Sequence, residues 1–391
     1  MNRHTDTQLH METLERDMER SLRAERSRRK RRRILQRIFA WLLVLVLVIA
    51  VAVAAVSLYI SRGGRRLHDR TAGARPNLEQ AETDTAEIGE QEDGYEPVVD
   101  TVWEEGWIRY QGKVYAYNED IVTFLVMGID KMEEVEESRD GVSGGQSDAL
   151  FLVILNPDDR SIRILAVNRD TMTDVVVYDP DKGEDSPVTT AQIASQHGFG
   201  DGRELSCELT RAAVSKLLYD LPISGYVSVN MAAIPELNDA LGGVDVTSLE
   251  DMHKVIKGAT EGAALHLEGM DAFWYVKYRD TTVFESARGR LARQKQYLTA
   301  FVNKAIAATK EDITLPLDLY GRLKQYMVTD IATDEVAYLA SELIHYSFEQ
   351  DAVYTLEGVT EMGEKHEEFY PDPQAMKDLM IRLFYREVEL P

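Results

Sequence analysis

The segment 147–171 contains two apolar runs rich in β-branched residues, separated by the sequence NPDD at 156–159. Turn-forming residues between two such runs predict a β-hairpin. The outer ends of an antiparallel pair meet, so we expect Asp148 and Arg169 to lie side by side at one edge of a sheet. A third apolar run leads to Asp130, which reaches the same edge if that strand neighbours the hairpin.

Asp130, Asp148 and Arg169 leave two interpretations open. Two carboxylates beside an arginine suit a hard divalent cation together with a phosphate. The plainer interpretation is that these are polar residues at strand ends, with one aspartate and Arg169 in a surface ion pair. The rest of the sequence bears on the choice between them.

Beyond the hairpin, strand-like and helix-like periodicities alternate along the chain. This alternation predicts an α/β fold in which helices cover a sheet. Residues 310–391 continue the helical pattern, with a short strand or loop at 353–357, and are expected to pack on the same domain rather than form a separate catalytic module. The other strands are expected at 121–128, 225–230 and 244–247, and the helices at 190–196, 207–218, 232–240, 270–275 and 286–309.

The helix expected at 286–309 directs polar residues toward the body of the protein. At about 100° per residue, its apolar face is centred roughly 60° from Arg290, with Gln294 at about 40° and Arg293 at about −60°. Arg290 and Gln294 therefore point inward, and Arg293 borders the same region. A buried arginine is seldom left without a partner, so this region holds either an internal carboxylate or an anionic ligand.

Two further cations, Lys277 and Arg279, follow the short helix at 270–275 and can reach the same region. The surrounding body is strongly acidic, because residues 62–391 hold 32 Lys and Arg against 61 Asp and Glu. A local cluster of cations in such a body predicts an anion site, with Asp130 and Asp148 available to hold a neutralising metal. No Walker P-loop, HExxH, GxSxG or zinc-type Cys/His cluster indicates a different chemistry. The five basic residues are Arg169, Lys277, Arg279, Arg290 and Arg293.

The N-terminal segment differs from the body. Residues 38–60 are 23 residues without a charge or a proline, enough to cross a bilayer as a helix. A cleaved signal peptide is the alternative, but its apolar region is shorter and no small-residue cleavage site stands out. Basic residues are concentrated at 26–37, so we expect a single-pass cell-membrane protein with its N-terminus in the cytoplasm and its body outside.

Composition and charge divide the chain into regions and narrow its partners. The single cysteine, Cys207, excludes an intramolecular disulfide. The acidity of the body argues against nucleic acid as a partner, and the basic tail is better explained by the lipid bilayer. The expected regions are a basic cytoplasmic tail at 1–37, disordered or helical along the membrane; a transmembrane helix at 38–60; an acidic tether at 61–100; and an extracytoplasmic domain at 101–391 with a core at 121–309.

Six stretches of the body resemble motifs of the LytR-CpsA-Psr family of cell-wall glycopolymer transferases. The resemblance runs from about residue 121 to about residue 303. It implies a three-layer α/β/α sandwich with a mixed central sheet and a deep apolar pocket for a polyprenyl chain. The stretches are FLVMGID (124–130), SDALFLVI (147–154), NRDT (168–171), LNDALGGVDV (237–246), LEGMDAFWYVKYR (267–279) and GRLARQ (289–294).

The resemblance also implies a Mg²⁺-dependent phosphotransferase. Its reaction moves an anionic glycopolymer, of teichoic acid or capsule type, from a polyprenyl-pyrophosphate carrier to peptidoglycan. Asp170 either orients the neighbouring arginine or acts as a base, and Lys277 and Arg293 add to the substrate-binding side chains. Carried over by position, the metal-associated acids are Asp130 and Asp148, and the pyrophosphate ligands are Arg169, Arg279, Arg290 and Gln294.

The sequence departs from the family's pattern at several positions. These departures bear on the acceptor and the rate more than on the fold, since a lysine, for example, lacks the bidentate geometry of an arginine. Asn168 replaces a usual proline, Gln146 and Lys277 replace arginines, Thr190 and Gln192 stand where the family has Lys and Asn, and Ala287 replaces an aspartate, with Glu285 nearby.

Two other functions stay open on the sequence alone. A scaffold that binds a wall polymer or lipid would keep the pocket and catalyse slowly or not at all. A polyprenyl-pyrophosphate-sugar pyrophosphatase would use water in place of the sugar acceptor. Incubation with a lipid-linked donor, with and without acceptor, separates these from the transferase.

Overall fold

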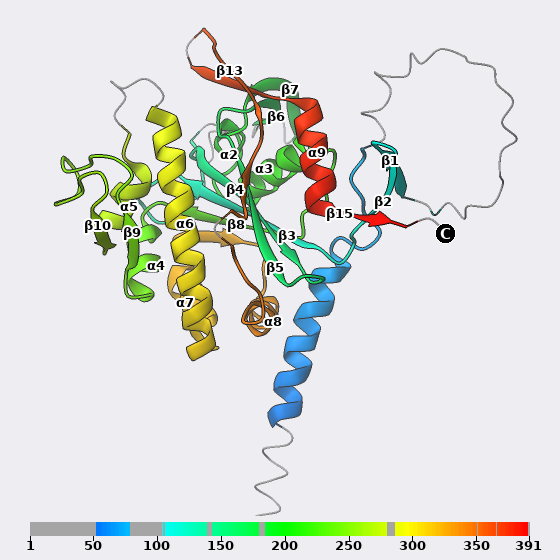
Figure 1. Ribbon diagram of the computed structural model, residues 1–391, viewed down its shortest axis with the longest axis horizontal. Helices are drawn as coiled ribbons and strands as arrows, with labels where there is room; N and C mark the ends of the chain where they lie inside the picture. Colours follow the sequence, from blue (N-terminus) through cyan, green and yellow to red (C-terminus); the bar gives the residue numbers. More distant parts are fainter. Residues whose placement is uncertain are drawn as a thin grey trace, which may run out of the picture. The chain divides into compact units, whose positions relative to one another are not determined.

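The computed structural model describes residues 52–78, 104, 106–138, 143–179, 184–279, 286–349, 351–364 and 366–389 (Figure 1). The chain divides into two units, Met1–Ser61 and Arg62–Pro391. In the first unit the described residues, 52–61, are helical. Most of the segment expected to span the membrane, 38–60, lies outside the described residues. Within the described part of the chain, no helix is both long enough and apolar enough to cross a membrane.

A six-stranded mixed sheet forms the centre of the second unit. The hairpin predicted from the sequence is confirmed, because β4 and β5 pair antiparallel from Leu150↔Val167 to Asn156↔Ser161. The neighbouring β3 runs antiparallel to β4 and parallel to β8. The order across the sheet is β11 (Met327–Thr329), β8 (Gly225–Asn230), β3 (Val122–Ile129), β4 (Ser147–Asn156), β5 (Ser161–Val167) and β12 (Val353–Thr355).

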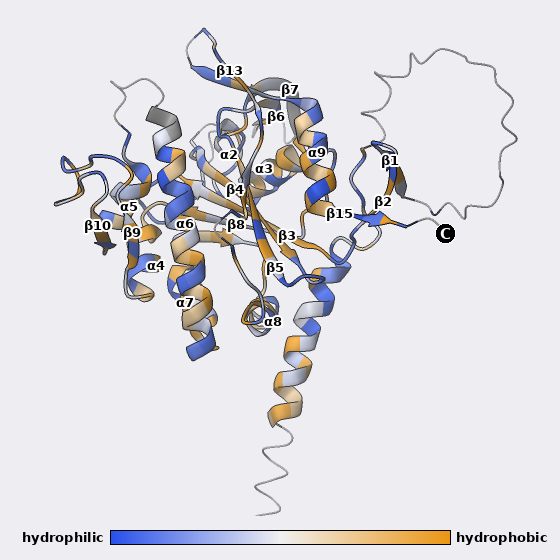
Figure 2. Cartoon of the chain, viewed as in Figure 1, coloured by the Kyte–Doolittle hydropathy of each residue, from blue (hydrophilic) through white to orange (hydrophobic). Residues whose placement is uncertain are grey.

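Helices cover both faces of this sheet because its strands are apolar on both sides. Leu125 and Met127 point to one face, where they pack with α3 (Glu204–Leu217) and α9 (Pro373–Phe384). Val122 and Phe124 point to the other, where they pack with α6 (Ser286–Glu311) and α8 (Thr333–Leu343). Figure 2 shows hydrophobic residues concentrated along the central strands. The second unit is therefore an α/β sandwich with a mixed sheet, in agreement with the sequence.

Smaller elements surround the sandwich. A third core cluster joins the β9–β10 hairpin, α4 and α5 to the side of α6 through Tyr297. The remaining strands are β1 (Trp107–Tyr110), β2 (Lys113–Tyr117) and β15 (Tyr385–Val388) in one sheet, and the hairpins β6 (Met172–Asp179)–β7 (Glu184–Gln192), β9 (Val244–Thr247)–β10 (Ala264–Leu267) and β13 (Gly358–Met362)–β14 (Glu367–Pro371). The remaining helices are α2 (Ser195–Gly198), α4 (Ala233–Ala240), α5 (Met270–Lys277) and α7 (Leu315–Leu323).

The helix expected at 190–196 is wrong. Residues up to Gln192 belong to β7, which pairs with β6, and only the short α2 follows. The β-branched run Val188-Thr189-Thr190 fits a pleated strand better than a helix, because branching at Cβ restricts the side chain in a helix. The strand carries Gln192 to the edge of the site described below.

Residues 62–78, expected as part of the tether, pack against the body instead. Leu67 and Leu78 are 0% and 2% exposed and join the two central core clusters. Arg70 donates hydrogen bonds to Asp330 Oδ2 at 2.7 Å and to Glu335 Oε2 at 2.9 Å. Arg70 of this segment is thus a partner for Asp330 and for the buried Glu335. Residues 79–100 lie outside the described part of the chain.

Candidate functional site

Asp148 and Arg169 meet at one edge of the central sheet, as the hairpin register predicts. Asp148 is the second residue of β4, and Arg169 follows the end of β5. The Arg169 guanidinium donates to Asp148 Oδ1 and, at 3.0 Å, to Gln146 Oε1. Its Nε also lies 3.4 Å from Asp170 Oδ1. Because the Asp148 side chain is only 8% exposed, this ion pair is shielded from water more than a typical surface pair.

Asp130 reaches the same edge, at the end of β3. Its backbone N–H donates to Gln146 O at 3.0 Å, which holds the two strand ends together. The ammonium of Lys277, the last residue of α5, contacts Asp130 Oδ1 and lies 3.7 Å from Asp148 Oδ2. The two carboxylates expected to share a metal therefore surround one cationic group.

Asp130 and Asp148 are the carboxylates that would hold a metal here. No group of three or more His, Cys, Asp or Glu side chains in the described residues forms a complete metal site. Two carboxylates nevertheless match the way Mg²⁺ is usually held at phosphate-binding sites, where substrate oxygens and water supply the other ligands. The Lys277 ammonium already lies against these carboxylates, so a metal would have to share or displace it.

The first turns of α6 form part of the wall of a cavity of about 540 Å³. Arg290, Leu291 and Gln294 line this cavity, together with Asp148, Arg169 and Asp170. We refer to it as the anion cavity. Gln294 also donates to Val276 O at 3.2 Å, which fixes α6 against α5. The helical spacing thus places Arg290 and Gln294 as the sequence predicted.

Arg290 differs from the other cations of this region. Arg169, Lys277 and Arg279 each contact a carboxylate, whereas Arg290 has no ion-pair partner within 4.0 Å among the described residues. Burial lowers the pKa of Arg290, and Asp148 acts in the opposite direction. A partly buried guanidinium with no carboxylate in contact favours an anionic ligand.

A hydrogen-bond network ties Asp170 to the β13–β14 hairpin. Gln192 Nε2 donates to Asp170 Oδ1 at 3.0 Å and to Glu367 O at 2.8 Å. The Phe369 N–H donates to Asp170 O at 2.9 Å. Burial raises the pKa of Asp170, and Arg169 opposes this shift. Asp170 is thus held in place by a strand far from it in the sequence.

Glu367 is a site residue that the sequence reasoning missed. It lines the anion cavity, and its Oε1 lies 3.7 Å from Arg279 Nη2. It comes from β14, beyond the motifs that carry the family resemblance, in a stretch with many other acidic residues. Nothing in the local pattern distinguishes it from its neighbours, so only the tertiary structure identifies it.

Arg293 lies away from the anion cavity. Its side chain is 1% exposed, and its guanidinium donates to the carbonyls of Tyr275 and Tyr278. Its Nε lies 2.6 Å from Glu250 Oε1. The internal partner that the sequence left open therefore accounts for Arg293, which holds the end of α5 against α6 and is not placed to bind a substrate.

Several departures from the family's pattern keep a polar contact. Asn168 Oδ1 accepts from the Asp170 N–H at 3.0 Å, so this residue shapes the turn that presents Arg169 and Asp170. Gln146 accepts from Arg169, and the Gln192 amide reaches Asp170. Thr190 lies on β7, opposite Asp174. The Ala287 side chain and the whole of Glu285 lie outside the described residues.

A second cavity, of about 450 Å³, is lined almost entirely by apolar side chains. We refer to it as the apolar cavity. Residues of β3, β4 and β5 form one side, including Phe124 and Val153, and residues of α6, α7 and α8 form the other, including Phe301 and Leu339. Phe151 lines both this cavity and the anion cavity. A charged site therefore adjoins an apolar one, which suits an amphiphilic ligand with an anionic head.

The sandwich and its paired cavities define an α/β protein that is suited to binding an amphiphilic anion. The chain belongs to the LytR_cpsA_psr family, whose model matches residues 81–380. The family expected from the sequence motifs is thus confirmed.

Individual relatives agree with this membership. The chain is 30% identical over 222 residues to the polyisoprenyl-teichoic acid–peptidoglycan teichoic acid transferase TagU of Bacillus cereus. The matched stretch covers 55% of this chain and 62% of that protein. It is 29% identical over 226 residues to TagU of Halalkalibacterium halodurans, covering 57% and 65%. The chain thus matches less than two thirds of the length of these relatives.

Solved structures share the fold. B. subtilis TagV superposes with a TM-score of 0.52 at 22% identity, over 67% of this chain and 95% of that chain. A Streptococcus agalactiae protein superposes with a TM-score of 0.54 at 20% identity, over 69% and 90%. At this level of identity the similarity concerns the architecture.

Proposed function

We propose that this protein is a membrane-anchored phosphotransferase that moves an anionic glycopolymer from a polyprenyl-pyrophosphate carrier to peptidoglycan. The observation that carries the proposal is that the two cavities share Phe151 as a lining residue and that Arg290, in the charged one, contacts no carboxylate among the described residues. We assign the polyprenyl chain to the apolar cavity and its pyrophosphate to the anion cavity. Family membership and the names of the TagU relatives support the same assignment.

The cationic side chains would act on the charge of the pyrophosphate. Arg169 and Arg290 line the anion cavity from different elements, and Arg279 contacts Glu367, which also lines it. Preorganised cations of this kind stabilise charge that grows on a leaving phosphate. A Mg²⁺ or Mn²⁺ ion held by Asp130 and Asp148 would neutralise part of the same charge when bound.

The acceptor hydroxyl would bond to the phosphorus that carries the glycopolymer. The bond from that phosphorus to the bridging oxygen then breaks, and this oxygen leaves as part of polyprenyl phosphate. We assign the hydroxyl proton to Asp170, which lines the anion cavity and accepts a hydrogen bond from Gln192. Burial raises the pKa of Asp170 toward neutral pH, and a carboxylate with a higher pKa is a stronger base.

The location of the protein belongs to the same proposal. We assign residues 38–60 to a single transmembrane helix, with the basic tail in the cytoplasm and the acidic body outside, beside the lipid carrier and the wall. This topology brings the body to both substrates. Labelling of single cysteines introduced at either end of the chain, in intact cells with a membrane-impermeant reagent, tests it. Labelling of the N-terminal tail from outside would contradict the orientation.

The reaction itself is tested with the full chain in bilayer nanodiscs. A polyprenyl-pyrophosphate-linked glycopolymer is supplied with uncrosslinked peptidoglycan and Mg²⁺, and both polymer transfer and polyprenyl phosphate release are measured. Equal amounts of the two products are expected. Binding without turnover would indicate a scaffold, and release without transfer would indicate a pyrophosphatase; either result contradicts the proposal.

A further inference from the structure

Arg279 lies close to the anion cavity without lining it. The family resemblance assigns Arg279 to the pyrophosphate, but it is not among the described residues that form the cavity wall. Its charge nevertheless acts there, because burial lowers the pKa of Arg290 and the charges of Arg169 and Arg279 lower it further. Glu367 does line the cavity, and its Oε1 lies 3.7 Å from Arg279 Nη2. A carboxylate of the cavity wall thus contacts a cation at the cavity's edge.

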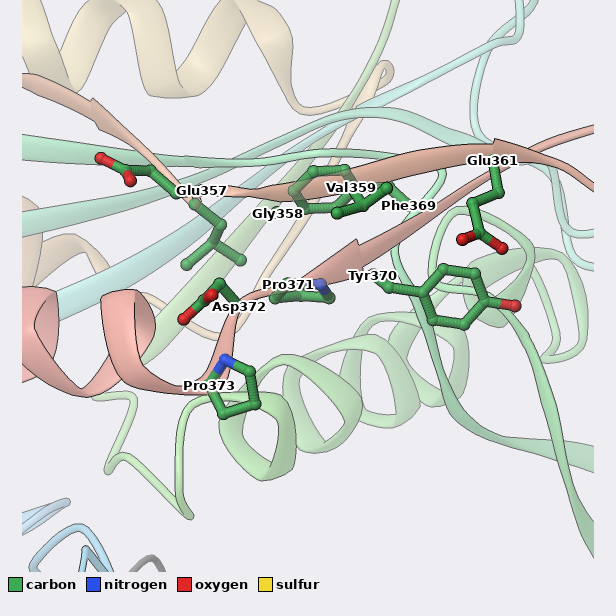
Figure 3. Close-up of a pocket in the computed structure, with 10 residues that line it drawn as sticks. Glu357, Gly358, Val359, Glu361, Phe369, Tyr370, Pro371, Asp372 and Pro373 are labelled. Carbon is green, nitrogen blue, oxygen red and sulfur yellow. The ribbon is translucent and has the colours of Figure 1, made fainter.

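The register of the β13–β14 hairpin directs Glu367 to the cavity and the adjacent Glu368 away from it. Successive side chains of a strand point to opposite faces. The outer face carries Glu361 and Tyr370, which line a concave surface on that side of the hairpin (Figure 3). The Tyr370 hydroxyl donates to Glu368 Oε2 at 2.6 Å on this outer face. The inner face carries the residues that line the anion cavity, namely Thr360, Met362, Glu367 and Phe369.

The backbone of Glu367 is fixed to the reaction site. Its carbonyl oxygen accepts from Gln192 Nε2 at 2.8 Å, and the same amide donates to Asp170 Oδ1. Two residues further on, the Phe369 N–H donates to the Asp170 carbonyl at 2.9 Å, and the Phe369 side chain is buried in the core. A change in the contact between Glu367 and Arg279 is therefore a rotation of side chains rather than an opening of the hairpin.

Glu367 is a weak partner for Arg279. The two side chains are 38% and 30% exposed, and their closest charged atoms are further apart than a hydrogen bond allows. Ion pairs of this kind contribute little, because water and salt screen them. A phosphate offers a guanidinium shorter, bidentate hydrogen bonds. A phosphate group that comes within reach of Arg279 should therefore displace the Glu367 carboxylate.

We propose that Glu367 is a positioning residue that holds Arg279 at the edge of the anion cavity and releases it to the second phosphate of a diphosphate. We refer to the pair of Glu367 and Arg279 as the latch. Arg169 and Arg290 already line the cavity and can bind one phosphate, whereas a second phosphate gains from a further cation. The lipid product of the proposed reaction carries one phosphate, so Glu367 can return to Arg279 after transfer. The latch rests on the proposed function for the nature of its ligand, but binding is measured without turnover.

The latch is tested with inorganic pyrophosphate, titrated by calorimetry into the full chain in detergent at fixed ionic strength and without divalent cations. Glu367→Gln keeps the size of the side chain and frees Arg279, so pyrophosphate should bind about fivefold more tightly. Glu368→Gln is the matched control, because it removes the same charge from the adjacent residue on the outer face. It should change the affinity by less than about twofold. Loss of a purely structural glutamate would not tighten binding.

A double variant separates the latch from simple repulsion between Glu367 and the ligand. Arg279→Ala should weaken pyrophosphate binding, and in this background Glu367→Gln should no longer improve it, because the cation that it releases is gone. Circular dichroism checks that each variant is folded. The latch is overturned by equal improvement in Glu367→Gln and Glu368→Gln, by improvement that persists without Arg279, or by unchanged or weaker binding in Glu367→Gln.

The latch and the proposed function fail in different ways. Affinities that follow the latch, together with no polymer transfer in nanodiscs, contradict the proposed function alone. Transfer by the unaltered protein, together with any of the three contrary affinities, contradicts the latch alone. Absence of pyrophosphate binding by the unaltered protein would contradict both.

Discussion

Two arginines on one helix, three residues apart, serve different regions of the molecule. Arg290 lines the anion cavity and contacts no carboxylate among the described residues, whereas Arg293 is buried between α5 and α6 and contacts two carbonyls and Glu250. The difference lies in their surroundings, since α5 ends beside Arg293 and offers carbonyl groups there. An arginine enclosed by carbonyl groups and a carboxylate stabilises the fold, and one that faces a cavity without a carboxylate contact is available to a ligand.

The largest expected effect is on activity, from Arg290→Ala. Because Arg290 contacts no carboxylate among the described residues, its removal leaves none of their buried acids without a cation, so the fold should be kept. Loss of a cation from a phosphoryl-transfer site lowers the rate about a thousandfold. The measurement is the transfer rate, with circular dichroism as the check on folding and Arg322→Ala, an exposed arginine on α7, as the matched control. Transfer at the original rate would remove Arg290 from the mechanism.

Arg293→Ala should have the opposite outcome. It removes hydrogen bonds from the carbonyls of Tyr275 and Tyr278 and leaves Glu250 without its cation. We expect a loss of about 3 kcal/mol in the free energy of unfolding, because buried carbonyl groups lose their partners. Chemical denaturation measures this loss, again against Arg322→Ala. A protein of unchanged stability with impaired donor binding would mean that Arg293 reaches the substrate after all.

The third effect concerns pH. Burial raises the pKa of Asp170 above 3.8, and a base must be ionised, so the transfer rate should rise with pH through this raised pKa. The same shift means that ionisation of Asp170 costs stability as pH rises from its unfolded to its folded pKa. Asp170→Asn should lower the rate about a hundredfold and abolish the acid limb of the pH–rate profile. An acid limb that persists in this variant would assign the limb to another group.

Local sequence relations predicted much of the site. Asp148 and Arg169 are joined by one hairpin, so turn chemistry and antiparallel pairing are enough to bring them together. Arg290 and Gln294 are one helical turn apart, and the helical period places both on the cavity side. In each case a single secondary-structure element or hairpin fixes the relation, so the sequence was sufficient.

Contacts between segments that are distant in the chain could not be predicted from the sequence. Glu367 reaches Arg279 because the β13–β14 hairpin is bonded to the Asp170 segment, a contact without a periodic signal. At about −60° from Arg290, Arg293 was on the flank of the helix, where a neighbouring element decides between cavity and core. The carbonyl groups of Tyr275 and Tyr278, at the end of α5, accept hydrogen bonds from Arg293 and keep it in the core. The packing of Leu67 likewise depends on the whole sandwich, since its own surroundings in sequence are polar.

The smallest expected effect comes from Lys277→Arg. This variant tests whether a cation that already contacts two carboxylates also contributes to ligand binding. The Lys277 ammonium lies between Asp130 and Asp148 as a compact point charge. A planar guanidinium offers more donors, so some would remain for a phosphate after both carboxylates are bound. We expect polyprenyl pyrophosphate to bind about threefold more tightly to the variant, measured by titration in detergent with and without Mg²⁺. Weaker binding only in the presence of Mg²⁺ would show instead that the larger side chain competes with the metal, and that the compact lysine leaves room for it.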